Sequence, residues 1–254
     1  MKIVVCVKRV PETAEAALKV DACGTRLAEE NLSFGMNETD NYALEQGLLL
    51  KEQFGGTVTL ITVGPAASEE VLRMGLAKGA DAAIRITPTN LASIDPFATA
   101  RLLAAEIRPL TPDVVLTGCV ASDDASAQVG VTVAELLGIT HVSLVVAMEM
   151  KQEKVATVRR ELEGGLQEEF TVCLPALFTA QSGLNEPRYA SILGIKRAAS
   201  KPIRVVEPGP PEEQMWSVRR LAAPPAGKRA EFLRGSPAEV AKQLVAILKG
   251  RAVL

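Results

Sequence analysis

The segment from Gly118 to Gly130 combines the features of a phosphate-binding turn. It reads GCVASDDASAQVG, follows the apolar run VVLT and leads into TVAELLG, which has helical spacing. Small side chains let a phosphate approach main-chain N–H groups, and the N-terminus of a following helix supplies about half a positive charge. The same turn carries two adjacent aspartates, Asp123 and Asp124, whose charges would repel an anion.

Main-chain donors and a helix end can hold a phosphate without any lysine, provided that the carboxylates point away from it. We therefore predict that Asp124 caps the following helix and that Asp123 accepts a hydrogen bond from a hydroxyl or a main-chain N–H. The alternative is that both aspartates only cap a helix and that no ligand binds, because this turn signature is weak by itself.

Two other segments have the same position relative to a strand. VCVKRVPET (residues 5–13) follows the first apolar run and TVGPAASEE (residues 62–70) follows the second. In an open α/β sheet, ligands bind outside the carboxyl ends of the strands. The three segments together therefore indicate a nucleotide site.

The sequence lacks the residues that several other kinds of active or binding site require. His141 is the only histidine and no GxSxG motif is present, which is evidence against a serine hydrolase. There is neither a GxxxxGK[ST] P-loop nor a GxGxxG fingerprint after the first strand. The four cysteines form no CxxC, so no zinc site is indicated. Cys6, Cys119 and Cys173 lie in strand-like runs and are expected to be buried in a protein of a reducing compartment.

Composition excludes further classes. A net charge of −2 and an aromatic content of 4% are evidence against nucleic-acid binding, which needs basic and stacking side chains. The N-terminal apolar run is too short for a signal peptide, and no run approaches the roughly 18 residues of a membrane span. We expect a cytoplasmic protein with no direct membrane insertion.

Four β-branched apolar runs predict strands at residues 2–8, 57–63, 82–87 and 113–118. Helical patterns lie between them. Asn37 can cap a helix over 38–54 with Asp40 at its third position, Ser68 precedes a helix that ends at Gly79, and Asp95–Pro96 opens a third helix. The alternation predicts an α/β fold with a doubly wound, mostly parallel sheet.

The pattern changes after about residue 141. Three strand-like segments follow with little helix between them, and QEKV (residues 152–155) could close a hairpin. Residues 201–235 hold six of the fifteen prolines and read as an extended arm, which ends in a helix over 236–250 with a Ser236–Glu239 capping box. We predict an α/β nucleotide-binding domain at 1–200 and a C-terminal arm and helix at 201–254. The helix could cover a partner or, as readily, its own domain.

The stretch LNEPRYASILGIKRAASKPI (residues 184–203) is a candidate docking surface. Ile192, Leu193 and Ile195 stand in a loop-like setting beside Lys196 and Arg197. Exposed apolar residues beside basic ones can form a docking patch, and the alternative is an ordinary solvated turn before a helix.

These segments resemble a known family. CVKRVPET, MNETDNYALEQGLLLKE, TVTLITVGPAASEEVLRMGLAKGAD, the turn Asp123–Gly130, VRRELEGGLQE and LNEPRYASILGIKRA follow one another as in the β subunit of electron transfer flavoprotein. The resemblance covers about residues 1–205. It implies an adenine-nucleotide-binding Rossmann-like domain in a heterodimer with the α subunit. Such a heterodimer carries electrons from acyl-CoA dehydrogenases or similar flavoenzymes of fatty acid oxidation to a membrane quinone oxidoreductase.

The resemblance also implies cofactors and site residues. FAD would be bound mainly by the α subunit and AMP by this chain. By position, the AMP site would comprise Cys6, Asn37, Glu38, Thr39, Asp40, Val63, Gly118, Cys119, Val120, Ala121, Ser122, Asp123, Asp124, Ala125, Ser126, Ala127, Gln128 and Val129. Glu161 would lie near the flavin interface. The segment with Tyr189, Ile192, Leu193 and Lys196 would dock on the dehydrogenase, with Ile192 or Leu193 as its apolar plug.

Two alternatives remain open at this stage. ASDDASAQVGV (residues 121–131) lies between the AMP-binding form of the turn and a form that holds a second FAD in electron-bifurcating relatives. MNETDNYALE favours the second-FAD form, whereas VRRELEGGLQE and LNEPRYAS favour the AMP-binding carrier, which is not itself an enzyme. Without the resemblance, a stand-alone ATP-binding module like a stress protein would fit the same pattern.

Overall fold

A computed structural model describes residues 1–13, 16, 18–89, 94–152, 154–209, 215–223 and 230–253, with the backbone alone at 151 and 152. Parts of the predicted arm (210–214 and 224–229) and Glu153 of the predicted hairpin turn lie outside the described residues. The chain divides into two compact units. One comprises Met1–Leu18 and Ala28–Arg219, and the other comprises Lys19–Leu27 and Arg220–Leu254.

The first unit is built on a nine-stranded sheet with the strand order β11-β5-β4-β1-β6-β10-β7-β8-β9. The strands from β11 to β7 are parallel, and β7, β8 and β9 pair antiparallel. Their bounds are β1 Lys2–Cys6, β4 Thr57–Val63, β5 Ala82–Ile86, β6 Val114–Gly118, β7 Thr140–Gln152, β8 Val155–Glu161, β9 Gln167–Cys173, β10 Ala176–Ala180 and β11 Arg204–Val206. The predicted mostly parallel α/β sheet is confirmed, and β7 and β8 pair antiparallel, as the predicted hairpin requires.

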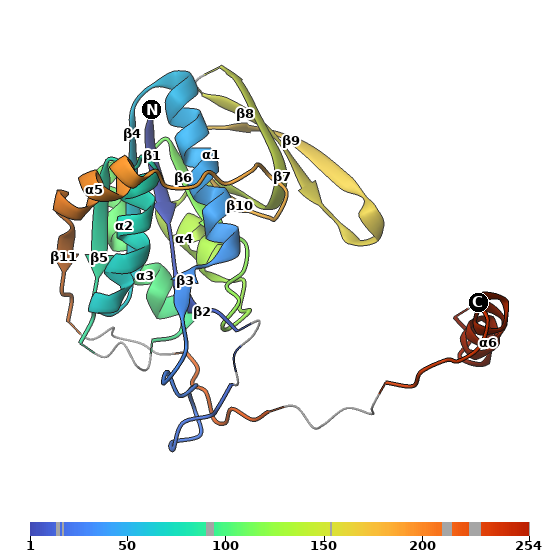
Figure 1. Cartoon of the computed structure of the whole chain (residues 1–254). Coiled ribbons are helices and arrows are strands. Elements are labelled where there is room, and N and C mark those ends of the chain that lie inside the picture. The colour runs from blue at the N-terminus through green and yellow to red at the C-terminus, as the bar shows by residue number, and fades with distance from the viewer. Residues whose placement is uncertain are drawn as a thin grey trace. The chain divides into compact units, whose positions relative to one another are not determined.

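Helices cover both faces of this sheet (Figure 1). They are α1 Glu38–Phe54, α2 Glu69–Lys78, α3 Pro96–Ile107, α4 Val129–Leu137 and α5 Ile192–Ser200. Side chains alternate along β1, so Ile3 and Val5 join a core with α1 and α2, while Val4 joins a second core with α3 and α4. The three predicted helices therefore exist, and each buries one apolar face.

A short antiparallel pair lies in the excursion between β1 and α1. It consists of β2 Arg9–Pro11 and β3 Phe34–Met36. The Arg9 guanidinium lies 3.7 Å from the centroid of the Phe34 ring, a cation–π contact across the pair. This ribbon fixes the chain that leaves β1 close to the start of α1.

Strand β7 pairs with two strands, which meet at Val145. Thr140–Val142 and Val145 pair with β10 in parallel, and the antiparallel pairing with β8 runs from Val145 to Gln152. Between Val142 and Val145, Leu144 has a φ of 59°, and its N–H donates to the Thr179 hydroxyl at 3.0 Å. The hydroxyl supplies an acceptor at this irregularity of the β10 ladder.

Two local expectations are wrong. Ile192, Leu193 and Ile195 lie on helix α5, which begins where the Ser191 hydroxyl accepts the N–H of Gly194 at 3.0 Å, and not in a loop. Cys173, the last residue of β9, is exposed, because alternate side chains of that strand face solvent. Cys6 and Cys119 are buried as expected.

The second unit contains helix α6 Pro237–Gly250. The predicted capping box is confirmed, because the Ser236 hydroxyl accepts from Glu239 N while the Glu239 carboxylate accepts from Ser236 N at 2.7 Å. Leu244 and Val245 of this helix are exposed. Val20 and Leu27 form an antiparallel bridge in the same unit.

Candidate functional site

The predicted nucleotide residues meet because of the sheet order. Strands β4, β1 and β6 are neighbours and parallel, so Val63, Cys6 and Gly118 at their ends share one edge of the sheet. The start of α1 reaches the same edge, since Asn37 N–H donates to the carbonyl of Lys8, two residues beyond β1, at 2.9 Å. Segments that lie far apart in the sequence thus form one site.

Asp40 joins three of these segments. One carboxylate oxygen accepts the N–H of Lys8 at 2.7 Å and the other accepts the N–H of Gly118 at 2.9 Å. The side chain is buried, and this burial raises the pKa of Asp40 to about 6, although the two N–H groups and the Lys8 charge oppose the rise. Asp40 therefore fixes the ends of β1 and β6 to the start of α1.

Asn37 has a different role from the predicted cap. Its side chain makes no capping bond. Instead, its amide nitrogen donates to the carbonyl of Val120 at 2.9 Å, and its amide oxygen accepts the N–H of Ser122 at 3.2 Å. The Thr39 hydroxyl donates to the same Val120 carbonyl at 2.8 Å. The first turn of α1 therefore holds the beginning of the acidic turn, and Glu38 beside it stays exposed.

Gly118 has no space for a side chain. A Cβ atom at this position would collide with the Thr39 hydroxyl and with the Asp40 carboxylate. The glycine that ends β6 is thus required by the close approach of α1.

The turn after β6 does not cap the next helix with an aspartate. Helix α4 begins at Val129 and its N-cap residue is Gln128, so the predicted cap by Asp124 is wrong. The Asp124 carboxylate accepts the N–H of Ser126 at 2.9 Å, within the turn itself. Ala125 and Ala127 have φ values of 52° and 53°, so their small side chains stand at left-handed positions.

Lys8 reaches this turn and was not predicted as a site residue. Its ammonium lies 2.7 Å from Asp123 Oδ1 and 2.8 Å from Asp124 Oδ2. Burial would lower the pKa of Lys8, but the two carboxylates outweigh it and raise the pKa above its ordinary value. Asp123 accordingly accepts from an ammonium, and no hydroxyl or main-chain N–H of the described residues donates to it as expected. The sequence signal was the lysine within VCVKRVPET, just beyond the first apolar run.

The cysteine thiols of the site stay protonated. Burial, with a smaller contribution from Asp40, raises the pKa of Cys6 to about 12. Burial also raises the pKa of Cys119, whose Sγ lies 3.2 Å from the Gln181 side-chain oxygen. Neither is an available nucleophile at neutral pH, so both line the site as small apolar groups.

The turn retains free donors. Among the described residues, the main-chain N–H groups of 127–131 have no protein acceptor, as is usual where a helix begins. The small side chains of Ala121, Ala125 and Ala127 leave room for a phosphate to approach the main-chain N–H groups. The donor set therefore fits a nucleotide phosphate held by main-chain contacts.

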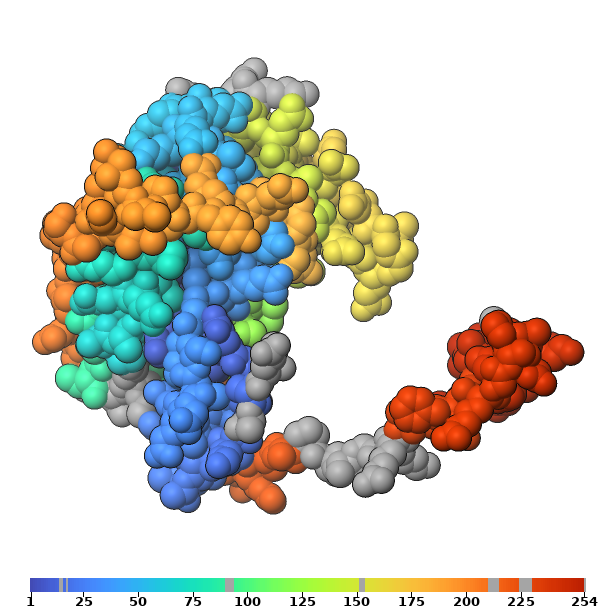
Figure 2. All heavy atoms as spheres, in the orientation of Figure 1, coloured from blue at the N-terminus to red at the C-terminus, as the bar shows by residue number. Residues whose placement is uncertain are grey.

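The predicted docking segment is anchored on α1. The Arg188 guanidinium lies 2.8 Å from Glu45 Oε1 and 2.5 Å from Glu52 Oε1, and Glu45 is buried. The Asn185 amide donates to the Tyr42 carbonyl at 3.0 Å. These bonds hold the segment across α1 and α2, where Figure 2 shows it in orange.

Helix α5 is also fixed to α2. The Arg73 guanidinium donates to the Ala198 carbonyl at 2.8 Å, and a Cβ atom on Gly194 would collide with the carbonyl of Ala77. On the outer side, Tyr189, Ile192 and Leu193 are 97%, 77% and 56% exposed. The structure thus brings three of the predicted docking residues together on a rigid base, and Lys196 is exposed on the same helix.

Glu161 lies apart from the nucleotide residues. It ends β8, in register with Gln167 of β9, and is exposed. Strands β10 and β7 stand between β8 and β6 in the sheet.

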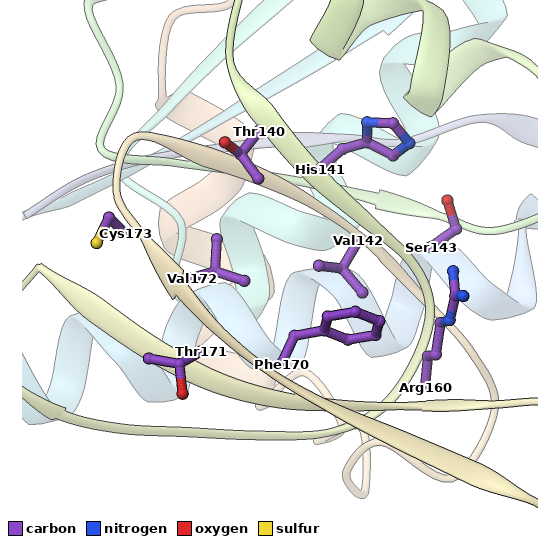
Figure 3. Close-up of a pocket in the computed structure, with 9 residues that line it drawn as sticks. All are labelled: Thr140, His141, Val142, Ser143, Arg160, Phe170, Thr171, Val172 and Cys173. Carbon is purple, nitrogen blue, oxygen red and sulfur yellow. The ribbon is translucent and has the colours of Figure 1, made fainter.

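A hollow of about 410 Å³ lies beside the first half of β7. It is lined by Thr140, His141, Val142, Ser143, Arg160, Phe170, Thr171, Val172 and Cys173. His141 and Val142 point to opposite sides of β7 (Figure 3). Arg160 is already paired with Glu168 at 2.6 Å and lies 5.1 Å from the Phe170 ring centroid. The hollow contains none of the predicted nucleotide or docking residues.

Two kinds of feature are absent from the described residues. None of the described helices combines the length and the apolar character that a membrane crossing requires. Within the same part of the chain, His, Cys, Asp and Glu side chains form no cluster of three that could hold a metal ion.

Comparison with known proteins gives a consistent result. The family model "Electron transfer flavoprotein domain" matches residues 25–211. The chain is 35% identical to "Electron transfer flavoprotein subunit beta" of Methylophilus methylotrophus, with 98% of each chain covered. It is 34% identical to the subunit of the same name from Bacillus subtilis (99% of each). It is also 35% identical to "Caffeyl-CoA reductase-Etf complex subunit CarD" of Acetobacterium woodii (100% of each).

Proposed function

Since the chain belongs to the electron transfer flavoprotein family, as its β subunit, we propose that it binds AMP at the acidic turn and carries electrons as half of a heterodimer with the α subunit. The electrons would come from acyl-CoA dehydrogenases or similar flavoenzymes of fatty acid oxidation and pass to a membrane quinone oxidoreductase. The flavin supplies the redox chemistry when it is bound. The residues of this chain bind and orient AMP and dock on the α subunit and the dehydrogenase.

The observation that carries the AMP proposal is the network around Asp40. It fixes the ends of β1 and β6 and the start of α1 in one place, next to unpaired N–H groups of a turn with small side chains. Adenine nucleotides bind at such strand ends through main-chain donors. The proposed site comprises Cys6, Asn37–Asp40, Val63 and Gly118–Val129.

A second FAD in the same place is the other candidate. The full-length similarity to a subunit of a caffeyl-CoA reductase complex is the observation that favours it. A chain of that type would belong to an enzyme complex that bifurcates electrons, and not to a simple carrier. The bound nucleotide distinguishes the two.

Nucleotide analysis is therefore the first experiment. The chain is co-expressed with its α subunit, the purified complex is denatured, and the released nucleotides are identified by chromatography and mass spectrometry. We expect one FAD and one AMP per heterodimer. Two FAD would establish the second candidate, and ATP on this chain alone without flavin in any complex would contradict both.

The docking proposal assigns the dehydrogenase contact to the outer side of α5. Ile192 and Leu193 would enter an apolar pocket of the dehydrogenase, with Tyr189 and Lys196 beside them.

Glu161 would lie near the flavin at the interface with the α subunit. Residues 201–254 would form an arm and a helix that dock on that subunit, which accounts for the exposed apolar residues of α6.

Replacing Ile192 and Leu193 together with alanine is expected to slow reduction by the dehydrogenase about tenfold or more, because central apolar contacts each contribute about 1–2 kcal/mol to such interfaces. The measurement is stopped-flow reduction of the complex by substrate-reduced acyl-CoA dehydrogenase. Flavin and AMP content should stay unchanged.

Leu18→Ala is the control, since Leu18 is exposed and lies outside α5. It should leave the rate at the wild-type value. Loss of flavin from the Ile192→Ala, Leu193→Ala complex would show that α5 supports the structure and does not serve as the docking surface.

A further inference from the structure

Lys8 bridges two carboxylates that lie far from it in the sequence. Its ammonium contacts Asp123 and Asp124 at 2.7 and 2.8 Å, so one positive charge stands between the two negative charges of the turn. Lys8 follows β1 by two residues and the turn follows β6, and these strands are neighbours in the sheet.

Both sides of the bridge are fixed to the start of α1. On the lysine side, Lys8 N–H donates to Asp40 and the Lys8 carbonyl accepts from Asn37 N–H. On the turn side, Asn37 and Thr39 bond to the Val120 carbonyl, and Asn37 accepts from Ser122 N–H. The main chains on both sides are therefore held in place, and the ammonium needs only its own side-chain conformation to reach the turn.

Stability does not explain this arrangement. The side chains of Lys8, Asp123 and Asp124 are 38%, 26% and 36% exposed. Ion pairs with this exposure contribute little to folding, typically less than a single ordinary hydrogen bond in a protein core. The bridge matters more for the electrostatic potential of the turn.

A nucleotide monophosphate adds roughly two negative charges at neutral pH. Without Lys8, the phosphate would approach two uncompensated carboxylates in the same turn, and repulsion between like charges is stronger where the surroundings are partly desolvated. With Lys8, the three side chains sum to one negative charge, and the ammonium contacts the turn that the phosphate would approach. Arg9 does not substitute for it, because its guanidinium is placed on Phe34 and Glu70.

We propose that Lys8 is a binding determinant of the nucleotide site: it supplies the positive charge that lets an acidic turn accept a phosphate. Its ammonium neutralises Asp123 and Asp124 and forms part of the electrostatic contact with the anion. This inference rests on the proposed nucleotide site. It predicts that phosphate affinity follows the summed charge of the three side chains.

The test uses the complete heterodimer with its FAD, freed of bound AMP and titrated with AMP by calorimetry. Lys8→Met removes the charge, retains the length of the side chain and should weaken AMP binding by about tenfold or more. The paired variant Asp123→Asn, Asp124→Asn should bind AMP more tightly than wild type. The asparagine side chain introduced by Asp124→Asn keeps an oxygen for the Ser126 N–H, so the turn keeps that bond.

The triple variant, with Lys8→Met added to both asparagine substitutions, should recover at least wild-type affinity. This rescue separates charge from fold, because a merely structural Lys8 would leave the triple variant as weak as Lys8→Met. The control is Lys2→Met, at the other end of β1, where the ammonium contacts Leu110 O and Thr111 Oγ1 and, among the described residues, no carboxylate.

Equal AMP affinity of Lys8→Met and wild type would overturn the inference while leaving the nucleotide site standing. Failure of the triple variant to recover would overturn it as well. A wild-type complex that binds no AMP would instead contradict the proposed function. Flavin absorbance and the mass of the complex confirm that every variant is assembled.

Discussion

Replacing Asp40 with asparagine is expected to lower the free energy of unfolding by about 3 kcal/mol at pH 7.5 and to release the nucleotide. Both oxygens of the buried carboxylate accept main-chain N–H groups, from Lys8 and from Gly118. Asparagine offers one oxygen, so its NH₂ group would face one of these donors. A buried donor without an acceptor costs about 1–3 kcal/mol, and the lost bond to a charged acceptor adds to it.

The effect of Asp40→Asn has a defined pH dependence. The folded pKa of about 6 exceeds the ordinary value of 3.8, so the folded state binds the proton more tightly than the unfolded state does. The stabilisation that comes from this proton is complete below about pH 4 and is lost as the pH rises through about 6. The free energy of unfolding of wild type should therefore exceed that of Asp40→Asn by about 1 kcal/mol more at pH 5 than at pH 7.5.

The measurement is urea denaturation of the heterodimer at one protein concentration, followed by circular dichroism at both pH values. Comparing the two proteins at each pH cancels the other titrating groups. Glu38→Gln, an exposed neighbour in the same helical turn, is the control and should change stability by less than about 0.5 kcal/mol. A constant difference between wild type and Asp40→Asn from pH 5 to 7.5 would contradict the raised pKa.

Replacing Arg188 with methionine should destabilise the protein by about 3 kcal/mol and slow reduction by the dehydrogenase. The guanidinium is the partner of Glu45, whose side chain is 5% exposed, and methionine would leave this carboxylate buried and unpaired. The bonds to Glu45 and Glu52 also raise the pKa of Arg188, so the guanidinium keeps its charge at every accessible pH. The docking segment would lose its strongest attachment to α1.

Two further variants isolate the cause. Adding Glu45→Gln to Arg188→Met should restore part of the stability, because it removes the unpaired charge. Glu52→Gln should cost less than about 1 kcal/mol, since Glu52 is 57% exposed. If Arg188→Met and Glu52→Gln had equal midpoints in urea, the buried Glu45 pair would not be the main support of the segment.

Much of the fold can be read from local sequence patterns. Continuous β-branched apolar runs and helical runs ending in glycine indicate the strands and helices of the parallel half, and Ser236 with Glu239 marks the last helix. The family resemblance indicates the nucleotide and docking segments. Helix α5 is not predicted, because its exposed apolar residues suggest a loop. Ser191, three residues before Gly194, is nevertheless a recognisable N-cap residue.

The contacts that complete the site depend on sheet order, which local patterns do not contain. Lys8 and Asp123 are 115 residues apart, and Arg188 and Glu45 are 143 residues apart. Their pairing follows only when β1 is placed beside β6 and the segment after β10 is placed across α1. The same dependence explains why local patterns assign Asp124 to the next helix and not to Lys8.

Helix α1 constrains which insertions and deletions the sequences of related chains can tolerate during evolution. Its first turn holds Asp40 against Lys8 and Gly118, and five residues later it presents Glu45 to Arg188. Each residue of an α-helix turns the next by about 100°. Inserting or deleting one residue between Asp40 and Glu45 would therefore swing Glu45 away from Arg188 or withdraw Asp40 from the strand ends. The spacing of these two acidic residues should resist insertions and deletions even where residues between them are substituted.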